Sequence, residues 1–518
     1  MKILPKKTWT IVLFLLLFLI SCQQLSNKGT QMLSLNFQDG DVPTLHPHLL
    51  EGHMRGRVLG KALFEGLTRI NSEGEAELAG AESVKISPSK TQYTFILRDH
   101  KWSDGSVVTA FQYEKAWKQA IAPLSDCTRA DLFYVIKEAE KAKKGILSLN
   151  EVGVKALDEK TLSVELTFPT PYFLKLIASP LFAPVIRNGT EPTRFNGPFK
   201  VHKWKRNSLL VLKANPFFWD SSKVSLSEIE IQMVDDPLTT LLMYEKQKID
   251  WIGSPFCKLS SETIFQLQEK GELQNQPVAR FLGIYINTSQ PFLASSKIRQ
   301  ALSLSIDRSL ISKHIDPGSS PLYQPLPSSF SLSPNLFSDN DIAQAKKLFE
   351  EGLQEIKSAR EIFPFLTLNY PNAACCKPLA EYLKERWKKT LGIEIKLEGT
   401  EWNILRSHLE KGTFQMGMCV SSALYPDPSE FLERFASIKA ANFPQWEHPI
   451  YQEKLDLAKK QPEQRIRYLR EAEELLFEQM PFIPICNSNA LYVHNPRLKG
   501  YVFDHNGCVD FRWAYVED

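Results

Sequence analysis

The chain has 518 residues, 43% apolar and 23% charged, which is the composition of a folded globular protein too long for one compact core. This composition excludes an intrinsically disordered chain, and the presence of a single long apolar stretch excludes a polytopic membrane protein. The net charge of +3 gives no reason to expect a nucleic-acid partner, because residues 1–21 hold three lysines and no acids, and without them basic and acidic residues are equal in number.

The apolar stretch lies at the start of the chain. Lysines precede the run 11–20, which is short for a membrane span and typical of a signal peptide. The run ends in Leu-Ile-Ser-Cys at 19–22, which resembles the lipobox of bacterial lipoproteins. We therefore expect residues 1–21 to be a signal peptide, Cys22 to carry a lipid anchor, and residues 22–31 to form a polar tether. An ordinary secretory peptide with a chance cysteine is the alternative.

The first elements of the exported chain follow clear hydrophobic patterns. Residues 32–37 alternate as a strand, residues 57–70 carry apolar side chains at helical spacing, and residues 93–98 alternate again. Residues 102–105 have the composition of a tight turn, in which glycine supplies a positive φ and aspartate binds nearby backbone.

A helix is expected directly after this turn, with Thr109 as its N-cap. The face of the helix expected to be buried comprises Phe111, Tyr113, Ala116, Trp117 and Ala120. Strand, turn and capped helix together account for the stretch 101–117, so its aspartate and serine are interpreted as structural rather than catalytic.

Strands and helices alternate through the rest of the chain, which favours an α/β fold. Strands are expected within 160–168, 208–219, 229–234, 393–399 and 481–486, and helices within 236–248, 297–315, 341–353, 377–392 and 462–480. The helix at 377–392 has one apolar stripe, made by Leu379, Leu383, Trp387 and Leu391.

Motifs of enzymes and cofactors are missing from the sequence. There is no GxSxG, HExxH, GxxxxGK[ST] or CxxC, and no GxGxxG after a strand, so we expect no catalysis, no cofactor and no metal. A hydrolase built from distant residues is the alternative. His46, His48 and His53 are spaced so that they could share a transition metal, but no cysteine or carboxylate pair completes the ligand set, and loop or ligand-contacting histidines are the favoured interpretation.

An ordered set of short segments carries a family resemblance. The segments are 40–52, 62–75, 93–113, 195–219, 298–308 and 479–485. In this order they resemble the peptide-binding branch of the ABC-importer solute-binding proteins, solute-binding family 5, which includes the periplasmic oligopeptide- and dipeptide-binding proteins. The resemblance covers essentially all of the exported chain.

The resemblance implies an α/β, two-lobed periplasmic-binding-protein fold of type II, cluster C, with an extra inserted domain. Lobe I would be discontinuous, the inserted domain would be continuous, and hinge closure between lobes I and III would enclose the ligand. The implied boundaries are 32–63, 185–279 and 491–518 for lobe I, 64–184 for the inserted domain II, and 280–490 for lobe III.

The resemblance also implies which residues bind the ligand. In relatives of the oligopeptide-binding type, an extended peptide pairs its backbone with strands of both lobes, which is β-augmentation. Carried over position by position, the pairing segments are Glu51, Gly52 and His53 on one side and Met418, Cys419, Val420, Ser421 and Ser422 on the other. Trp402 matches a tryptophan that the family places beside the ligand, and a core aromatic is the alternative.

Three positions depart from the family pattern. Met418 stands where relatives have a basic residue, and Cys376 aligns roughly with a histidine that some relatives direct at the C-terminal carboxylate of the ligand. The third departure concerns the amine of the ligand. Relatives place an aspartate for the free ammonium of the peptide just before a YPDP-like turn, and this chain has Leu424 there. Either Asp427 or Glu51 binds the amine instead, or the ligand has no free amine. Asp427 also fits the ordinary role of a turn and helix-cap residue.

The expected function is that of a lipid-anchored extracytoplasmic solute-binding protein of an ABC importer, capturing oligopeptides or peptide-like solutes. Its partners would be the ligand, the permease subunits of the inner membrane and, through Cys22, a membrane of the cell envelope, with no nucleic acid and a monomeric state. Alternatives are the same scaffold with a nickel chelate, haem or a cell-wall peptide, a secreted hydrolase, and a sensing or adhesive lipoprotein.

Overall fold

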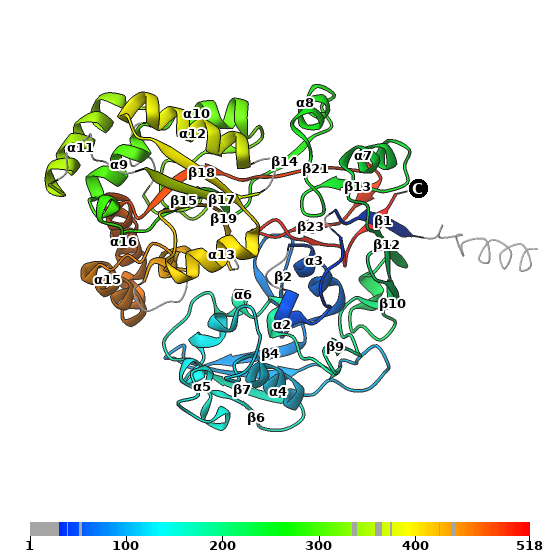
Figure 1. Ribbon diagram of the computed structural model, residues 1–518. Helices are drawn as coiled ribbons and strands as arrows, with labels where there is room; N and C mark the ends of the chain where they lie inside the picture. Colours follow the sequence, from blue (N-terminus) through cyan, green and yellow to red (C-terminus); the bar gives the residue numbers. More distant parts are fainter. Residues whose placement is uncertain are drawn as a thin grey trace, which may run out of the picture.

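A computed structural model describes residues 31–38, 40–50, 54–333, 339–357, 365–372, 376–423, 425–436 and 442–517. The predicted signal peptide, Cys22, the segment Glu51–Gly52–His53 and Leu424 lie outside the described residues. Within these ranges, no helix combines the length and the apolar character needed to cross a bilayer. Figure 1 shows three regions, one on the left, one on the right and one below them.

The first region, here called lobe I, is built on a four-stranded sheet with the order β1-β12-β11-β10. Its strands are β1 (Met32–Asn36), β12 (Glu228–Gln232), β11 (Leu209–Ala214) and β10 (Phe199–Lys205). β1 runs parallel to β12, although almost 200 residues separate them in the chain. Apolar residues of β1, of α3 (Met54–Leu63) and of the C-terminal segment share one core, which explains why both chain ends belong to this region.

The second region, the inserted domain, has its own sheet and its own core. The sheet order is β4-β5-β7-β6, formed by β4 (Ala81–Ile86), β5 (Gln92–Leu97), β7 (Thr161–Glu165) and β6 (Val154–Ala156). Its core is built from residues between Leu67 and Val185, together with Tyr425 from a distant part of the chain. α4 (Ala110–Ala120) packs on β6 and β7 from one side of the sheet.

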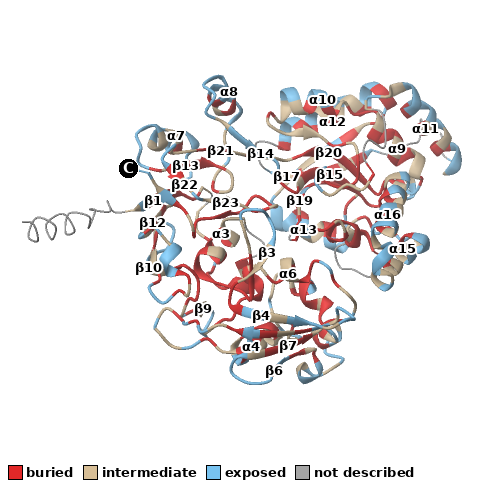
Figure 2. Cartoon of the chain, turned by 180° about the vertical axis from the view of Figure 1, so that it is seen from behind, coloured by how far each residue is buried: buried red, intermediate tan, exposed pale blue. Residues whose placement is uncertain are grey.

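The third region, lobe III, contains a six-stranded mixed sheet with the order β16-β20-β15-β19-β17-β18. The strands are β16 (Ser320–Pro321), β20 (Phe482–Asn487), β15 (Arg280–Ile286), β19 (Met416–Ser422), β17 (Leu366–Pro371) and β18 (Ile395–Thr400). β15 lies antiparallel to both neighbours, whereas β17 is parallel to β18 and β19. Figure 2 shows buried residues along these central strands and exposed residues on the outer helices.

Helices cover both faces of this sheet because its side chains alternate between two cores. Leu282, Ile284 and Met418 pack with α9 (Ser296–Leu304), α11 (Ile342–Glu355) and α12 (Cys376–Leu391) on one face. Phe281, Tyr285 and Cys419 pack on the other face with α13 (Trp402–Lys411), α14 (Ser429–Leu432), α15 (Pro449–Lys460) and α16 (Arg465–Gln479).

The chain passes between lobe I and lobe III at residues 277–279 and again at 488–489. A small sheet on the lobe I side contains β13 (Trp251–Gly253), β21 (Ala490–His494) and β14 (Gln274–Gln276). β14 continues into β15, and β20 continues into β21, so two neighbouring segments join the lobes. The backbone N–H of Ala279 donates to the carbonyl of His505 at 2.6 Å, which ties one crossing to the C-terminal segment.

The predicted turn and helix at 102–120 are confirmed. Gly105 has a φ of +88°, and Asp104 accepts a hydrogen bond from the Ser106 N–H at 3.0 Å. Thr109 forms a capping box with Gln112 at the start of α4. One residue of the predicted buried face is wrong: Phe111 is 51% exposed, because it lies two positions from Tyr113 and therefore points to the opposite side of the helix.

Two helix predictions extend too far. The helix predicted within 57–70 ends at Leu63. Thr68–Ile70 forms strand β2, which pairs with β3 (Ala76–Leu78). The pattern at 297–315 breaks after α9, because the Asp307 carboxylate accepts the Leu310 N–H at 2.8 Å and starts α10 (Arg308–Leu310). Tertiary pairing and a local cap override the helical periodicity in these two places.

The other predicted elements have counterparts in the structure. The apolar stripe of the predicted helix 377–392 is confirmed, since its four members are buried in α12. The predicted helix within 236–248 is α7 (Pro237–Glu245), on the lobe I side. Further helices that the sequence patterns did not predict include α8 (Ser261–Glu269) on the lobe I side, and α2 (Pro47–Leu50), α5 (Ala139–Lys143) and α6 (Phe173–Leu176) nearer the inserted domain.

Candidate functional site

β19 has one edge that is fully paired and one that is not. Along its whole length, from Met416 to Ser422, it pairs antiparallel with β15. On the other edge, β17 pairs with Met416 and Gly417. Among the described residues no strand pairs with 418–422 on that second edge. The middle of the sheet of lobe III therefore contains an open strand edge, here defined as residues 418–422.

The hydrogen bonds on either side of the strand fix which backbone groups face this open edge. The Ala423 N–H donates to Ala279, and the Gln415 carbonyl accepts from Asn287, each at 2.9 Å. Backbone groups of a strand alternate in direction, so the odd-numbered residues of β19 face β15. The N–H and C=O groups of Met418, Val420 and Ser422 consequently point to the other side, where β17 ends.

β17 stops because of its last residue. In the observed register, Leu368 lies opposite Met416 and Asn369 opposite Gly417. The next N–H that β17 would offer along this edge is that of residue 371, and Pro371 has none. The sequence thus ends the parallel ladder at this point and leaves the Val420 backbone available for another partner.

The side chains of the open edge are uncharged and mostly buried. Met418 and Cys419 pack in the two cores of lobe III, and burial raises the pKa of the Cys419 thiol to about 12. Ser421 is also buried and lies 2.9 Å from the Tyr285 hydroxyl. Val420 is 44% exposed. This segment can therefore offer its backbone and the Val420 side chain to a ligand, but not the thiol or the methionine.

A buried ion pair holds the end of the open edge. The Arg434 guanidinium donates to the Ser422 carbonyl at 2.8 Å and to both carboxylate oxygens of Glu430 at 2.6 Å. Burial lowers the pKa of Arg434, but the Glu430 carboxylate outweighs this effect and raises the pKa overall. Sequence reasoning missed both residues. Their i, i+4 spacing indicated a helical pair, but not its contact with Ser422.

Trp402 is the first residue of α13 and is 40% exposed. The alternative of a core aromatic therefore does not fit the structure. Nearby, Glu401 caps the helix by accepting the Asn403 N–H at 3.0 Å. An exposed tryptophan at a helix start presents a large apolar surface to whatever lies beside it.

Asp427 is engaged within lobe III. Its carboxylate accepts the Ser429 N–H at 2.9 Å and the Ser429 hydroxyl at 2.6 Å. The Arg465 guanidinium lies 2.5 Å from the same oxygen. These contacts are those of a turn and helix-cap residue whose charge is already neutralised.

Two of the three clustered histidines, His46 and His48, lie among the described residues. His46 and His48 are buried with ring centroids 4.9 Å apart, and burial lowers the pKa of His46 to about 4 and of His48 to about 3. The backbone N–H of His48 donates to Nδ1 of His46 at 3.2 Å. Within the described ranges, no group of three or more histidine, cysteine, aspartate or glutamate residues is arranged to hold a metal ion. The third histidine, His53, lies outside those ranges.

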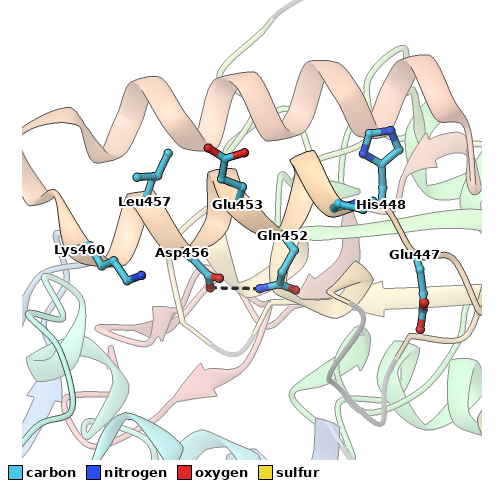
Figure 3. A pocket seen from close by; sticks show the side chains of 8 residues that line it. Glu447, His448, Gln452, Glu453, Asp456, Leu457 and Lys460 are labelled. Atoms are coloured by element: carbon cyan, nitrogen blue, oxygen red, sulfur yellow. Dashed lines mark hydrogen bonds between the residues drawn. The ribbon is translucent and has the colours of Figure 1, made fainter.

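A surface groove of about 460 Å³ runs along α15 and is shown in Figure 3. Its lining residues all come from the single segment 447–460, and two of them, Gln452 and Asp456, hydrogen-bond to each other at 3.1 Å. Polar groups do not converge on it from separate elements, as they do in ligand sites. We therefore interpret it as a solvated helix surface.

Comparison with known proteins identifies the family. Residues 75–443 match the middle region of the bacterial extracellular solute-binding proteins, family 5. The chain is 33% identical to the oligopeptide-binding protein OppA of Bacillus subtilis, over 99% of this chain and 100% of the relative. The chain therefore belongs to family 5 of the bacterial extracellular solute-binding proteins, and the resemblance found in the sequence is confirmed.

Solved structures agree with this assignment. The chain matches OppA of Listeria monocytogenes bound to peptide with a TM-score of 0.80 and 25% identity, over 95% of this chain and 100% of the other. It matches the murein tripeptide binding protein MppA of Escherichia coli with a TM-score of 0.82 and 26% identity, over 94% and 99%. The predicted two-lobed α/β fold is thereby confirmed.

Proposed function

We propose that this protein is a lipid-anchored, non-catalytic solute-binding protein that captures oligopeptides or peptide-like solutes outside the cytoplasm for an ABC importer. The observation that carries the proposal is the open strand edge at Met418–Ser422, with the Val420 N–H and C=O directed away from β15. The family membership and the peptide-binding names of its relatives support it.

An extended peptide would add a strand beside β19 and pair with the backbone of Val420 and with the Ser422 N–H, because the Ser422 carbonyl already accepts from Arg434. Because backbone groups are the same in every peptide, this pairing gives affinity that depends little on sequence. The exposed Val420 side chain and Trp402 would border the peptide. On the lobe I side, the family pattern assigns the second pairing segment to Glu51, Gly52 and His53.

Capture would proceed by hinge closure between lobe I and lobe III. The two neighbouring crossings at 277–279 and 488–489 are the segments that would change conformation. The predicted boundaries, with residues 64–184 as the inserted domain and 280–490 as lobe III, agree with the separate cores. A ligand favours closure only through contacts that it makes better in the closed state.

The class of ligand depends on whether this protein can bind the free amine of a peptide. Leu424 cannot hold an ammonium, and Asp427 is already paired with Arg465. Burying an ammonium without a partner costs several kcal/mol, on the order of the binding energy of a micromolar ligand. Either Glu51 would bind the amine, or the ligand would have an amine that is blocked or lies elsewhere, as in a cell-wall peptide.

The remaining parts of the proposal concern the cellular setting. The segment 19–22 resembles a lipobox, so the anchor would be at Cys22, and residues 22–31 would give the globular part a short reach from the membrane. The partners would be the permease subunits of an ABC importer, and the protein would act as a monomer in the cell envelope.

The proposal is tested by native mass spectrometry of the protein as purified, followed by calorimetry with tetra-alanine and with N-acetyl-tetra-alanine. We expect a co-purified peptide-like mass and binding that survives acetylation. Turnover of peptide or ester substrates, abolished by mutation of a defined nucleophile, would establish the hydrolase alternative. Binding that disappears on acetylation would contradict the argument from Leu424.

A further inference from the structure

The inserted domain contacts lobe III at the loop that follows the open strand edge. Tyr172, between β7 and α6, stacks on Tyr425 with ring centroids 4.3 Å apart and an interplanar angle of 11°. Each of the two tyrosines is only 6% exposed, and Tyr425 packs into the hydrophobic core of the inserted domain. Tyr425 lies three residues after Ser422, so a buried contact with another domain adjoins the candidate site.

Two cations of lobe III lie over aromatic rings of the inserted domain. The Arg465 guanidinium lies 5.7 Å from the centre of the Tyr172 ring and also pairs with Asp427, two residues after Tyr425. Lys459 lies 5.4 Å from the centre of the Phe168 ring of the inserted domain and 3.3 Å from the Glu433 carboxylate. Cations over aromatic faces are attracted to them, most strongly where water is excluded.

An ionic contact of the inserted domain is connected to the open strand edge through two residues of lobe III. Arg129 of the inserted domain lies 3.8 Å from the Glu430 carboxylate. Glu430 holds Arg434 with both its oxygens, and Arg434 donates to the carbonyl of Ser422. The inserted domain is therefore connected to the last residue of the edge through the Glu430 and Arg434 pair, and to the following loop through Tyr172.

We infer that Tyr172 of the inserted domain is a positioning residue for ligand binding, which holds residues 425–428 and, through them, the adjoining end of the open strand edge. The inference rests on the proposed function. Lobe III carries the edge, and the inserted domain supplies the contact that orders it. A loop ordered before binding loses less conformational freedom when the ligand arrives, so affinity rises without a contact between Tyr172 and the ligand.

The stacked pair of Tyr172 and Tyr425 also affects the balance between the open and closed arrangements of the lobes. The inserted domain is connected to lobe I in the chain, whereas Tyr425 belongs to the chain of lobe III. Separation of the two lobes would break the stacked pair, so the pair favours the closed arrangement even without ligand. Affinity then depends on the fraction of molecules that are already closed.

The first experiment requires no ligand and uses amide hydrogen exchange of the full exported chain. We expect Tyr172→Ala to raise exchange about tenfold in the segment 425–436, while Tyr172→Phe, which keeps the ring, exchanges like the wild type. A matched control is Phe111→Ala, a half-exposed aromatic on α4, which Figure 1 shows on the far side of the inserted domain from α13. We expect this control to leave the segment unchanged.

The second experiment measures binding of tetra-alanine and N-acetyl-tetra-alanine by calorimetry. Aromatic pairs of this kind contribute the equivalent of about a tenfold change in an equilibrium constant. Tyr172→Ala should weaken the binding of the better probe about tenfold, and Tyr172→Phe should restore it to within about twofold. Should Tyr172→Ala fail to fold, Arg129→Ala serves as a milder variant, with an expected weakening of about threefold.

The outcomes separate this inference from the proposed function. Unchanged exchange in Tyr172→Ala overturns the positioning role, whether or not the wild type binds peptides. Raised exchange with unchanged affinity, in a wild type that binds, overturns it as well. If the wild type binds neither probe and carries no peptide when purified, the proposed function fails, and the exchange experiment still decides whether Tyr172 orders the loop.

Discussion

The outer strands of the two large sheets in lobe III and the inserted domain differ from the open strand edge inside lobe III in the charge that they carry. β4, an outer strand of the inserted domain, exposes Glu82 and Lys85, and β18, an outer strand of lobe III, carries the ion pair of Lys396 and Glu398. Charged side chains of this kind discourage pairing with another chain. The open edge at 418–422 has no charged residue at all.

This difference indicates that the two kinds of edge serve different purposes. An outer edge is exposed to every neighbouring molecule and is protected by its charges. The open edge lies inside lobe III, between β15 and the end of β17, and not at the outer side of the sheet. An uncharged edge in this position is less exposed to pairing with other protein molecules than an outer edge, and it is suited to binding an extended backbone.

The largest effect is expected when the buried support of the open edge is removed. Arg434→Gln leaves the Glu430 carboxylate buried without its main cation, which should lower the free energy of unfolding by about 3 kcal/mol. Urea denaturation measures this change. The matched control is Arg406→Gln, whose i, i+4 pair with Glu410 is exposed and should contribute at most about 0.5 kcal/mol. Equal effects of the two variants would contradict the proposed support.

A second prediction concerns pH and lobe III. Burial raises the pKa of Glu473 on α16 to about 7, although its carboxylate accepts hydrogen bonds from Ser331 and Leu332 at 2.8 Å. The folded state thus holds this proton more tightly than the unfolded state, and its contribution to stability falls as pH rises from about 4.5 to about 7.

Glu473→Gln should therefore be more stable than the wild type by about 2 kcal/mol at pH 8, and should differ little at pH 4.5. Thermal denaturation across this pH range provides the test. Glu478→Gln, an exposed position on the same helix, is the control and should show no such pH dependence. A wild type that gains stability from this carboxylate as pH rises would show the opposite sign and contradict the prediction.

A third prediction concerns the open edge itself. Val420→Pro removes an N–H that points away from β15, so it should weaken peptide binding about 10- to 100-fold while the ladder between β15 and β19 stays intact. Val420→Ala keeps the N–H and should change affinity by no more than about threefold. Calorimetry with the better of the two tetra-alanine probes measures both. Equal affinities for the two variants would show that this N–H does not contact the ligand.

The smallest change in stability is expected at the protected edge. Replacing Glu82 and Lys85 of β4 by valine should alter the free energy of unfolding by less than about 0.5 kcal/mol, but it should promote self-association, visible in light scattering. Exchanging the two charges, with Glu82→Lys and Lys85→Glu, keeps the edge charged and should leave the protein monodisperse. A valine variant that stays equally monodisperse would weaken the contrast between the edges.

Local features were predictable from the sequence where neighbouring residues determine them. The capping box of Thr109, the turn at Gly105 and the apolar stripe of α12 depend on residues within one turn or helix, and they are confirmed. The family segments identified the two-lobed fold, which the comparisons confirm.

Features that depend on distant pairings were not predictable in this way. The end of the helix at Leu63 depends on Thr68–Ile70 pairing with β3, and the open edge depends on where β17 stops relative to β19. The pairing of Asp427 with Arg465 joins residues 38 positions apart, which no local pattern encodes. The binding roles of Glu51, Gly52, His53 and Leu424 stay predictions, as do those of Trp402 and of Met418–Ser422.

The most direct test of the open strand edge follows the amide protons of β19 one by one, by NMR, without and with a bound peptide. The structure predicts that Cys419 and Ser421, which face β15, are protected from exchange in both states, whereas Val420 and Ser422 become protected only when the peptide is bound. Protection of all four amides without ligand, or no change at Val420 and Ser422 on binding, would contradict it.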